Sequence, residues 1–303
     1  ILTVLAGSTL LTSATEITHS FLGVGKANQA TIIGEDGNVT WKADFPASDG
    51  WVLPNGNVLL ALYKCEGFPN GGAVEIERST KKVLFRYVGP HKETSAVEKL
   101  ANGNYLVTEL GPKPQVVEVN SNGKVIKTTP LACQKKNAHM QTRMARKLEN
   151  GNYLVPHLLA FKVKEYSPEG KVVSSFATDM EALGGRDAKN WPFTAIRFEN
   201  GNTLVCLTNG NKVVEMDAEG NVVWKVSNKD LPGNPIDDAC GGQRLCLLDH
   251  HPFRILLVQG ILAGSVDELF LESDKEWAHQ RYSWSSMGIP CSEGEVLLRN
   301  GTG

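Results

Sequence analysis

A basic residue recurs at one position of a repeated pattern, directly before the apolar residue that precedes a predicted turn. The residues at this position are Lys99, Lys147, Arg197 and Arg244, and Arg143 and Arg146 lie just upstream of Lys147. Guanidinium and ammonium groups bind carboxylates and sulfates. The pattern therefore predicts a positively charged ring that holds a small anion. The other interpretation places these side chains between neighbouring sheets, paired with acids or covering apolar surface with their stems.

Two histidines precede predicted strands in successive repeats. His91 lies in GPHKETSA, and His139 begins the run HMQTRMARKLENGNYLV. Because histidine changes charge near neutral pH, it can act as a general base or a nucleophile. His139 is therefore a candidate catalytic residue and His91 a candidate ligand-binding residue. A surface or hydrogen-bonded structural role is the alternative for both, and we expect a structural role for His157.

The repeat that must position these residues is marked by two sets of turn glycines. The first set is Gly56, Gly103, Gly151 and Gly201, which are 47, 48 and 50 residues apart, and the second is Gly37, Gly123, Gly170 and Gly220. Asn-Gly between β-branched and aromatic runs predicts a tight type I′ hairpin turn. Each repeat therefore carries two hairpins, which make four short antiparallel strands.

Four strands cannot bury both faces of their sheet without neighbours. A helical solenoid is the alternative for such a repeat, but the segments between glycines do not follow a period of 3.6 residues. We predict one all-β domain over residues 1–303, a β-propeller of about six four-stranded blades, with seven also compatible. Residues 1–7 and 295–301 are expected to complete one blade jointly, which closes the ring.

The repeat breaks after Leu245, where the next turn is expected. The sequence there reads CLLDHHPFRILLVQGILAG, followed by DKEWAHQRYSWSSMGIPC. Three explanations stay open for residues 246–292: a functional insertion, a blade of drifted sequence but ordinary structure, and a local error of reading frame.

Composition excludes several classes of protein. The formal net charge is −2 and no long basic run occurs, so nucleic acid is not an expected partner. The chain contains no uncharged apolar stretch of about 18 residues, so no membrane span is predicted. Six cysteines occur without a CxxC pair, which argues against a zinc site and leaves free thiols and a disulfide both open. A periplasmic or secreted location follows only if a leader preceded Ile1.

The repeated NGN-x-L-V and G-K/N-V-V-W elements carry a resemblance to a known group. Over residues 30–245 the chain resembles bacterial β-propellers of the pyrroloquinoline-quinone-type-repeat and arylsulfotransferase-like group. The resemblance implies six to eight blades, often in exported proteins, and for sulfate transfer a catalytic histidine at the central funnel, for which His139 is the candidate. The quinone enzymes carry a docking tryptophan in most blades, whereas here only Trp41 and Trp224 end the outer hairpin. We therefore predict no cofactor and do not expect pyrroloquinoline quinone.

Three functions are compatible with these residues. The first is a non-catalytic binding or scaffold propeller that recognises a small anionic ligand, a glycan or a protein at one mouth of the channel. The alternative is an arylsulfotransferase-like transferase or hydrolase in which His139 acts and Arg143, Arg197 and Arg244 stabilise an anion. The third is a quinone-dependent dehydrogenase. Fold alone does not choose among them.

Overall fold

The structure is a computed structural model that describes residues 20–25, 29–34, 36–133, 137–230, 236 and 238–245 and three further strands at 254–259, 265–271 and 277–283. The described elements are β-strands, apart from four single-turn 3-10 helices, η1 (Ala138–Met140), η2 (Glu181–Leu183), η3 (Arg186–Ala188) and η4 (Asn228–Asp230). The all-β class predicted from the repeat is confirmed.

Four sheets contain four antiparallel strands each, in the order of the chain. One sheet is β7 (Glu93–Lys99), β8 (Tyr105–Leu110), β9 (Gln115–Val119) and β10 (Val125–Pro130), and the next is β11 (Arg146–Lys147), β12 (Tyr153–His157), β13 (Lys162–Tyr166) and β14 (Val172–Ala177). The third is β15 (Trp191–Arg197), β16 (Thr203–Thr208), β17 (Lys212–Met216) and β18 (Val222–Ser227). The fourth is β19 (Ala239–Leu245), β20 (Arg254–Gln259), β21 (Ser265–Leu271) and β22 (Trp277–Ser283).

The fifth sheet has six strands, because one long strand serves two hairpins. Its strands are β1 (Phe21–Gly23), β2 (Gln29–Ile33), β3 (Val39–Val52), β4 (Val58–Leu62), β5 (Gly72–Ile76) and β6 (Val83–Val88). In β3, Lys42 lies opposite Thr31 of β2, whereas Gly50 lies opposite Leu60 of β4. The register shifts on both sides of this change of partner.

The predicted count of about six four-stranded blades, or seven, is therefore wrong for the described residues, which form four sheets of four strands and one of six. The reason is that no turn interrupts residues 39–52, so two units that the repeat counts separately share β3. The predicted blade made from residues 1–7 and 295–301 lies outside the described residues. Within the predicted irregular region 246–292, β20, β21 and β22 complete the sheet that β19 begins.

The first hairpin turn of each repeat differs from the predicted type I′ geometry. In the turn after β3, the N–H of Gly56 donates to the carbonyl of Leu53 at 2.8 Å, and the Leu53 N–H donates to the Asn57 carbonyl at 2.8 Å. Gly56 has φ +84°, whereas Asn55 is not among the described residues with positive φ. This is a type I turn followed by a left-handed glycine, the next most common hairpin connection. The Asn55 side chain supports it by accepting the N–H of Asn57 at 3.1 Å.

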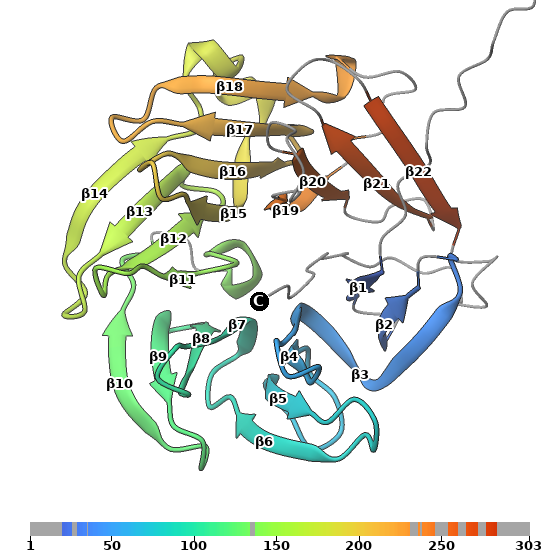
Figure 1. The fold of residues 1–303 in the computed structure, drawn as a ribbon. Coiled ribbons are helices and arrows are strands. Elements are labelled where there is room, and N and C mark those ends of the chain that lie inside the picture. The colour runs from blue at the N-terminus through green and yellow to red at the C-terminus, as the bar shows by residue number, and fades with distance from the viewer. Residues whose placement is uncertain are drawn as a thin grey trace, which may run out of the picture.

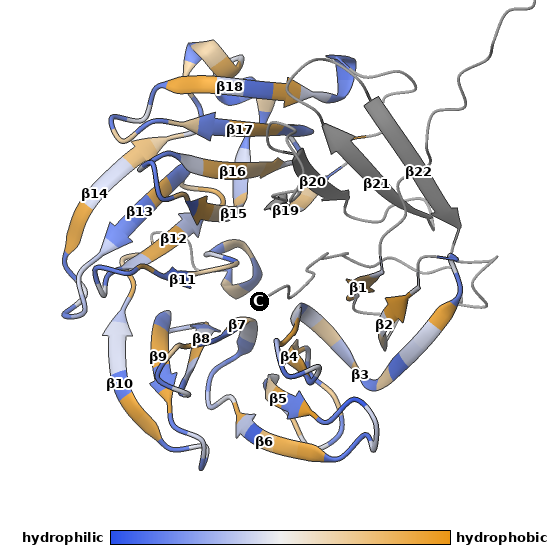
Figure 2. Ribbon diagram, in the orientation of Figure 1, coloured by the Kyte–Doolittle hydropathy of each residue, from blue (hydrophilic) through white to orange (hydrophobic). Residues whose placement is uncertain are grey.

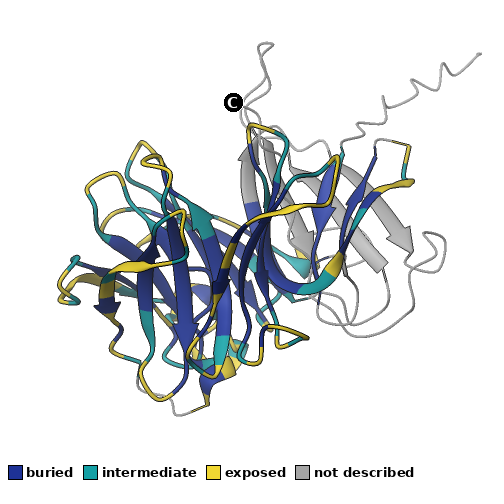
Figure 3. Cartoon of the chain, turned by 90° about the horizontal axis from the view of Figure 1, so that it is seen from below, coloured by how far each residue is buried: buried dark blue, intermediate teal, exposed yellow. Residues whose placement is uncertain are grey.

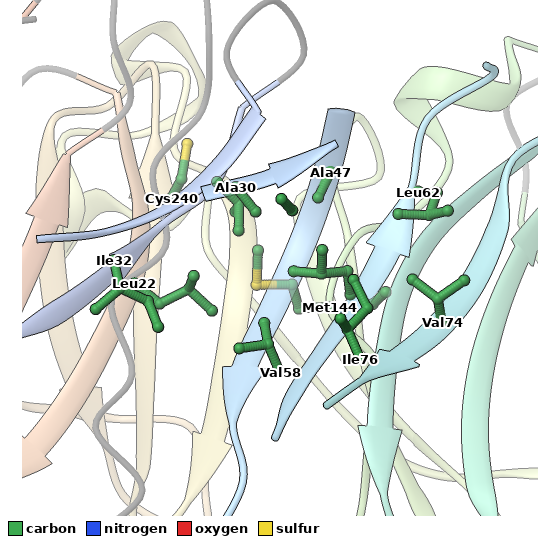
Figure 4. Packing of buried hydrophobic residues seen from close by; sticks show 14 of the residues in the cluster. Leu22, Ala30, Ile32, Ala47, Val58, Leu62, Val74, Ile76, Met144 and Cys240 are labelled. Atoms are coloured by element: carbon green, nitrogen blue, oxygen red, sulfur yellow. The ribbon is translucent and has the colours of Figure 1, made fainter. Parts of the chain in front are cut away.

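The sheets surround a common axis, with β7, β11 and β15 near it and β6, β10, β14 and β18 at the periphery (Figure 1). Apolar segments lie on inner and outer strands alike (Figure 2). The inner and outer strands differ in burial, because inner and middle strands are buried while turns and outer strands are exposed (Figure 3). The main apolar cluster draws one residue or more from each sheet, including Ala47, Ala96, Met144, Phe193 and Cys240 on or beside the inner strands. Part of this cluster is shown in Figure 4.

Candidate functional site

Neighbouring inner strands are tied together by hydroxyl groups at equivalent positions. Ser48 of β3 donates to the carbonyl of Ser95 in β7 at 3.1 Å, and Ser95 donates to the carbonyl of Arg143 at 3.1 Å. Thr194 of β15 donates in the same way to the carbonyl of Cys240 at 2.5 Å. Since equivalent positions are joined, these strands begin at the same end of the ring. We call that end the mouth, and the opposite end, where the first hairpin turns lie, the turn face.

Two of the predicted site residues, Arg143 and His139, meet at the mouth around the carboxylate of Glu93, which was not predicted. Glu93, the first residue of β7, accepts a hydrogen bond from Arg143 Nη1 at 2.8 Å on its Oε1 atom. The same Oε1 lies 3.0 Å from Nδ1 of His139, which belongs to η1. The side chain of Arg143 is 3% exposed, that of Glu93 17% and that of His139 50%. We call these residues the Glu93 triad.

The contacts of the triad keep Glu93 ionised and determine which ring nitrogen of His139 faces it. Burial of Glu93 opposes ionisation, but hydrogen bonds and charge from His139 and Arg143 outweigh it and hold the pKa of Glu93 below its usual value. An ionised carboxylate only accepts hydrogen bonds, so Nδ1 of His139 carries the hydrogen that it donates. The other ring nitrogen, Nε2, is then the atom that faces outward from this contact. An imidazole held by a carboxylate in this way can accept a proton or, once protonated, bind an anion.

The two candidate histidines do not share a site. His91 Nε2 lies 3.6 Å from Oε2 of Glu109, a buried residue of β8 that also receives hydrogen bonds from Tyr87 and Gln115. Burial, and then Glu109, raises the pKa of Tyr87. Glu93 lies opposite Leu110 and Thr94 opposite Glu109 in the β7–β8 ladder, so the two glutamates point to opposite faces of the sheet. His91 and His139 therefore belong to separate contacts.

The predicted ring of cations is found at the turn face, and each described member pairs with an acid of the preceding sheet. Lys99 Nζ lies 2.8 Å from Glu75 Oε2, and Lys147 Nζ lies 2.5 Å from Glu118 Oε1. Arg197 Nη2 lies 3.5 Å from Glu165 Oε2. Tyr105 and Tyr153 donate to the same glutamates at 2.7 and 2.6 Å. The structure thus places these three cations between sheets, as the second interpretation had it. The side chain of Arg244 lies outside the described residues.

Arg146 is more deeply buried than these cations, and its side chain contacts a different sheet. Its Nη2 lies 2.9 Å from Oδ2 of Asp49 in β3, 97 residues earlier in the chain. Asp49 is fully buried and also accepts the N–H of Val97 at 3.1 Å. The guanidinium stands 5.1 Å from the ring of Trp51. This buried pair joins three neighbouring sheets at the centre of the ring and is not exposed to a ligand.

Sequence reasoning missed the acids that organise these contacts. A glutamate recurs in the third strand of each regular repeat, at Glu75, Glu118, Glu165 and Glu215, and this recurrence could have identified the partners of the cations. Glu93 has no such repeat. Its separation of 46 residues from His139 is close to one period, however, and that spacing places residues at similar heights in neighbouring sheets.

His157 occupies a buried structural contact. Its Nε2 lies 2.9 Å from the hydroxyl of Tyr166, and its Nδ1 lies 3.6 Å from Sγ of Cys133. Burial, and then the charge of Lys164, lowers the pKa of His157 to about 3, so the ring is neutral. Burial raises the pKa of Cys133 to about 12, so this sulfur is a thiol and not an activated nucleophile.

Among the residues that the structure describes, no group of three or more histidine, cysteine, aspartate or glutamate side chains is arranged to hold a metal ion. No helix in the same residues is both long and apolar enough to cross a membrane.

The sheets around a common axis define the chain as an all-β propeller, and solved structures with the same architecture confirm this class. A protein of unknown function from Bacteroides caccae matches with a TM-score of 0.60 and 20% identity, over 93% of this chain and 94% of that one. Virginiamycin B lyase from Staphylococcus aureus matches with a TM-score of 0.56 and 12% identity, over 87% and 84%. The WD40 β-propeller domain of Doa1 matches with a TM-score of 0.52 and 11% identity, over 89% and 80%.

One family model also matches. It is described as Mal s 1 allergenic protein-like, and it covers residues 131–248, a segment shorter than half of the chain. No curated protein matches. The predicted membership of the pyrroloquinoline-quinone-type-repeat and arylsulfotransferase-like group is not confirmed, because the likeness is to β-propellers in general.

Proposed function

We propose that the chain is a binding propeller that holds a small anionic ligand at the mouth, against the Glu93 triad. The observation that carries the proposal is the placement of His139, whose half-exposed ring is fixed through Nδ1 while Nε2 faces away from Glu93. A site of this kind needs a side chain that is both accessible and held in one orientation. His139 meets both conditions, whereas Lys99, Lys147 and Arg197 are engaged by glutamates.

Charge explains why an anion is the favoured ligand. With His139 neutral, the charges of Glu93 and Arg143 cancel. When His139 gains a proton, the triad carries a net charge of one positive unit. Nε2–H can then donate a hydrogen bond to a ligand carboxylate or sulfate. The low pKa of Glu93 keeps that carboxylate ionised, so the positive form of His139 retains its partner.

His139→Gln keeps a donor toward Glu93 and cannot become charged. It should weaken the binding of a small carboxylate or sulfate by about tenfold or more, as expected for loss of a hydrogen bond to a charged group.

Calorimetric titration with a panel of small carboxylates and sulfates makes this measurement. His91→Gln is the matched control, because His91 contacts Glu109 on the opposite face of the β7–β8 pair. The proposal fails if His91→Gln and His139→Gln weaken binding equally.

A second candidate function is catalysis with His139 as general base. The specific observation that favours it is the contact between Glu93 and Nδ1, which directs Nε2 outward in the way that carboxylate-held catalytic histidines are directed. Aryl sulfates and aryl esters test the transferase or hydrolase predicted from the sequence. Virginiamycin B belongs in the same panel because a lyase acting on it shares the fold.

If this candidate holds, the parent protein turns over one of these compounds and His139→Ala lowers kcat at least about 100-fold, the scale of general acid–base catalysis. His91→Ala should leave the rate near that of the parent. Absence of turnover in the parent across the panel would exclude the enzyme and leave the binding proposal as it stands.

A further inference from the structure

Three partly buried apolar side chains lie at the same end of the ring as the Glu93 triad. They are Phe45, two residues before Ala47 of β3, Met140 in η1, and Trp191 at the start of β15. Each packs against the main apolar cluster while part of its surface stays accessible. We call these three residues the apolar collar. Because they come from three different sheets or connections, the collar exists only in the assembled ring.

Two segments that carry collar residues are connected to the triad. Met140 directly follows His139 in η1, so one short helix supplies both kinds of group. The guanidinium of Arg143 stands 5.4 Å from the ring of Phe193, two residues beyond Trp191. The N–H of Met144 donates to the Phe193 carbonyl at 3.3 Å, which ties the segment that carries Arg143 to β15.

Phe45 is also held in place by a contact with a buried ring. Its ring meets the buried ring of Phe68 edge to face, with centroids 5.9 Å apart and an interplanar angle of 87°. The arrangement holds Phe45 in place without covering it. Small-molecule sites in proteins combine a mostly apolar lining with a few placed polar groups, and the collar and the triad together supply both.

We infer that the ligand of the mouth is an aryl carboxylic acid, a flat apolar body that bears one carboxylate. This inference rests on the proposed function and extends it to the class of ligand. Tryptophan and phenylalanine offer aromatic faces and edges to a flat body, and the methionine thioether adapts to its outline. Protonated His139 binds the carboxylate through Nε2–H, with Glu93 and Arg143 holding the imidazole in place.

The test uses the whole chain and three probes at a pH of about 6. The probes are 2-naphthoate, which has body and carboxylate, 2-naphthamide, which has the body without charge, and acetate, which has the carboxylate alone. Ligand-detected NMR titration gives the affinity of each. We expect 2-naphthoate to bind at least about tenfold more tightly than either other probe, since it gains both kinds of contact.

Variants separate the two contributions. Trp191→Ala should weaken 2-naphthoate and 2-naphthamide by about tenfold and leave acetate unchanged, whereas His139→Gln should reduce 2-naphthoate to the level of 2-naphthamide. Trp224→Ala, at a partly buried tryptophan of the outer strand β18, is the control and should change nothing. If Trp191→Ala lowers the thermal midpoint enough to affect folding, Met140→Ala makes the same test from a different segment.

The outcomes show separately whether the ligand is an aryl acid and whether the mouth binds an anion. If acetate binds as tightly as 2-naphthoate and only His139→Gln weakens both, the anion site stands and the aryl ligand is wrong. If 2-naphthoate and 2-naphthamide bind equally and His139→Gln has no effect, the collar binds apolar bodies and the proposed anion site is wrong. Absence of binding by all three probes overturns both.

Discussion

Replacing Arg146 by leucine is expected to lower the free energy of unfolding by about 3–5 kcal/mol, the usual effect of removing one partner from a buried ion pair. Asp49 is fully buried and would lose the guanidinium that now lies 2.9 Å away. The contact also links sheets that are far apart in the chain, so its loss should loosen the centre of the ring. Equilibrium unfolding in urea measures the change.

The matched control is Arg186→Leu. Arg186 forms an ion pair with Asp179 at 2.6 Å, but its side chain is 63% exposed, and pairs of this kind contribute about 0–1 kcal/mol. Arg146→Leu should therefore be several-fold more destabilising than Arg186→Leu, although both remove one charge-paired arginine. Equal effects of the two substitutions would mean that Asp49 and Arg146 do not form a buried pair.

Replacing Glu118 by leucine is expected to lower the free energy of unfolding by about 2–3 kcal/mol, because it leaves the buried hydroxyl of Tyr153 and the ammonium group of Lys147 without their shared acceptor. Glu149→Leu, at an exposed turn position, is the control and should change stability by less than about 0.5 kcal/mol. The same urea experiment compares them.

Acid provides an independent check on Glu118. Burial opposes its ionisation, but hydrogen bonds from Lys147 and Tyr153 and the charge of Lys147 hold its pKa below the usual value. A group whose pKa is lowered by folding stabilises the protein above its unfolded pKa and loses that contribution as the pH falls through its folded pKa. The difference in stability between the parent and Glu118→Leu should therefore be constant above a pH of about 5 and shrink below about 4. A difference that grows in acid would contradict the contact.

The architecture followed from the sequence because the turns repeat. Asn-Gly and Asp-Gly or Glu-Gly pairs at a regular spacing indicate hairpins wherever they occur, and hairpins of this length must stack to bury their faces. The number of sheets did not follow in the same way. Turns can be counted along a chain, but residues 39–52 continue as one strand through the point where a unit boundary was expected, and local sequence does not mark a strand that changes partner.

The basic residues show a different limit. Their equivalence in the repeat was correctly recognised, yet the same pattern was compatible with an open ring of charge and with pairs between sheets. Only contacts between sheets separate these interpretations, as at Lys147, whose partner Glu118 lies 29 residues earlier. The candidate histidine was found from its position before an inner strand. Its partner Glu93 was not, because the contact depends on two sheets being side by side.

The most direct test of the binding site is a crystal structure of the protein with 2-naphthoate at a pH of about 6. We expect density at the mouth, with the carboxylate within about 3 Å of Nε2 of His139 and the naphthalene ring against Trp191 and Met140. Density for the ligand at the turn face, beside Lys99 or Lys147, would contradict it, as would a ligand at the mouth whose carboxylate points away from His139.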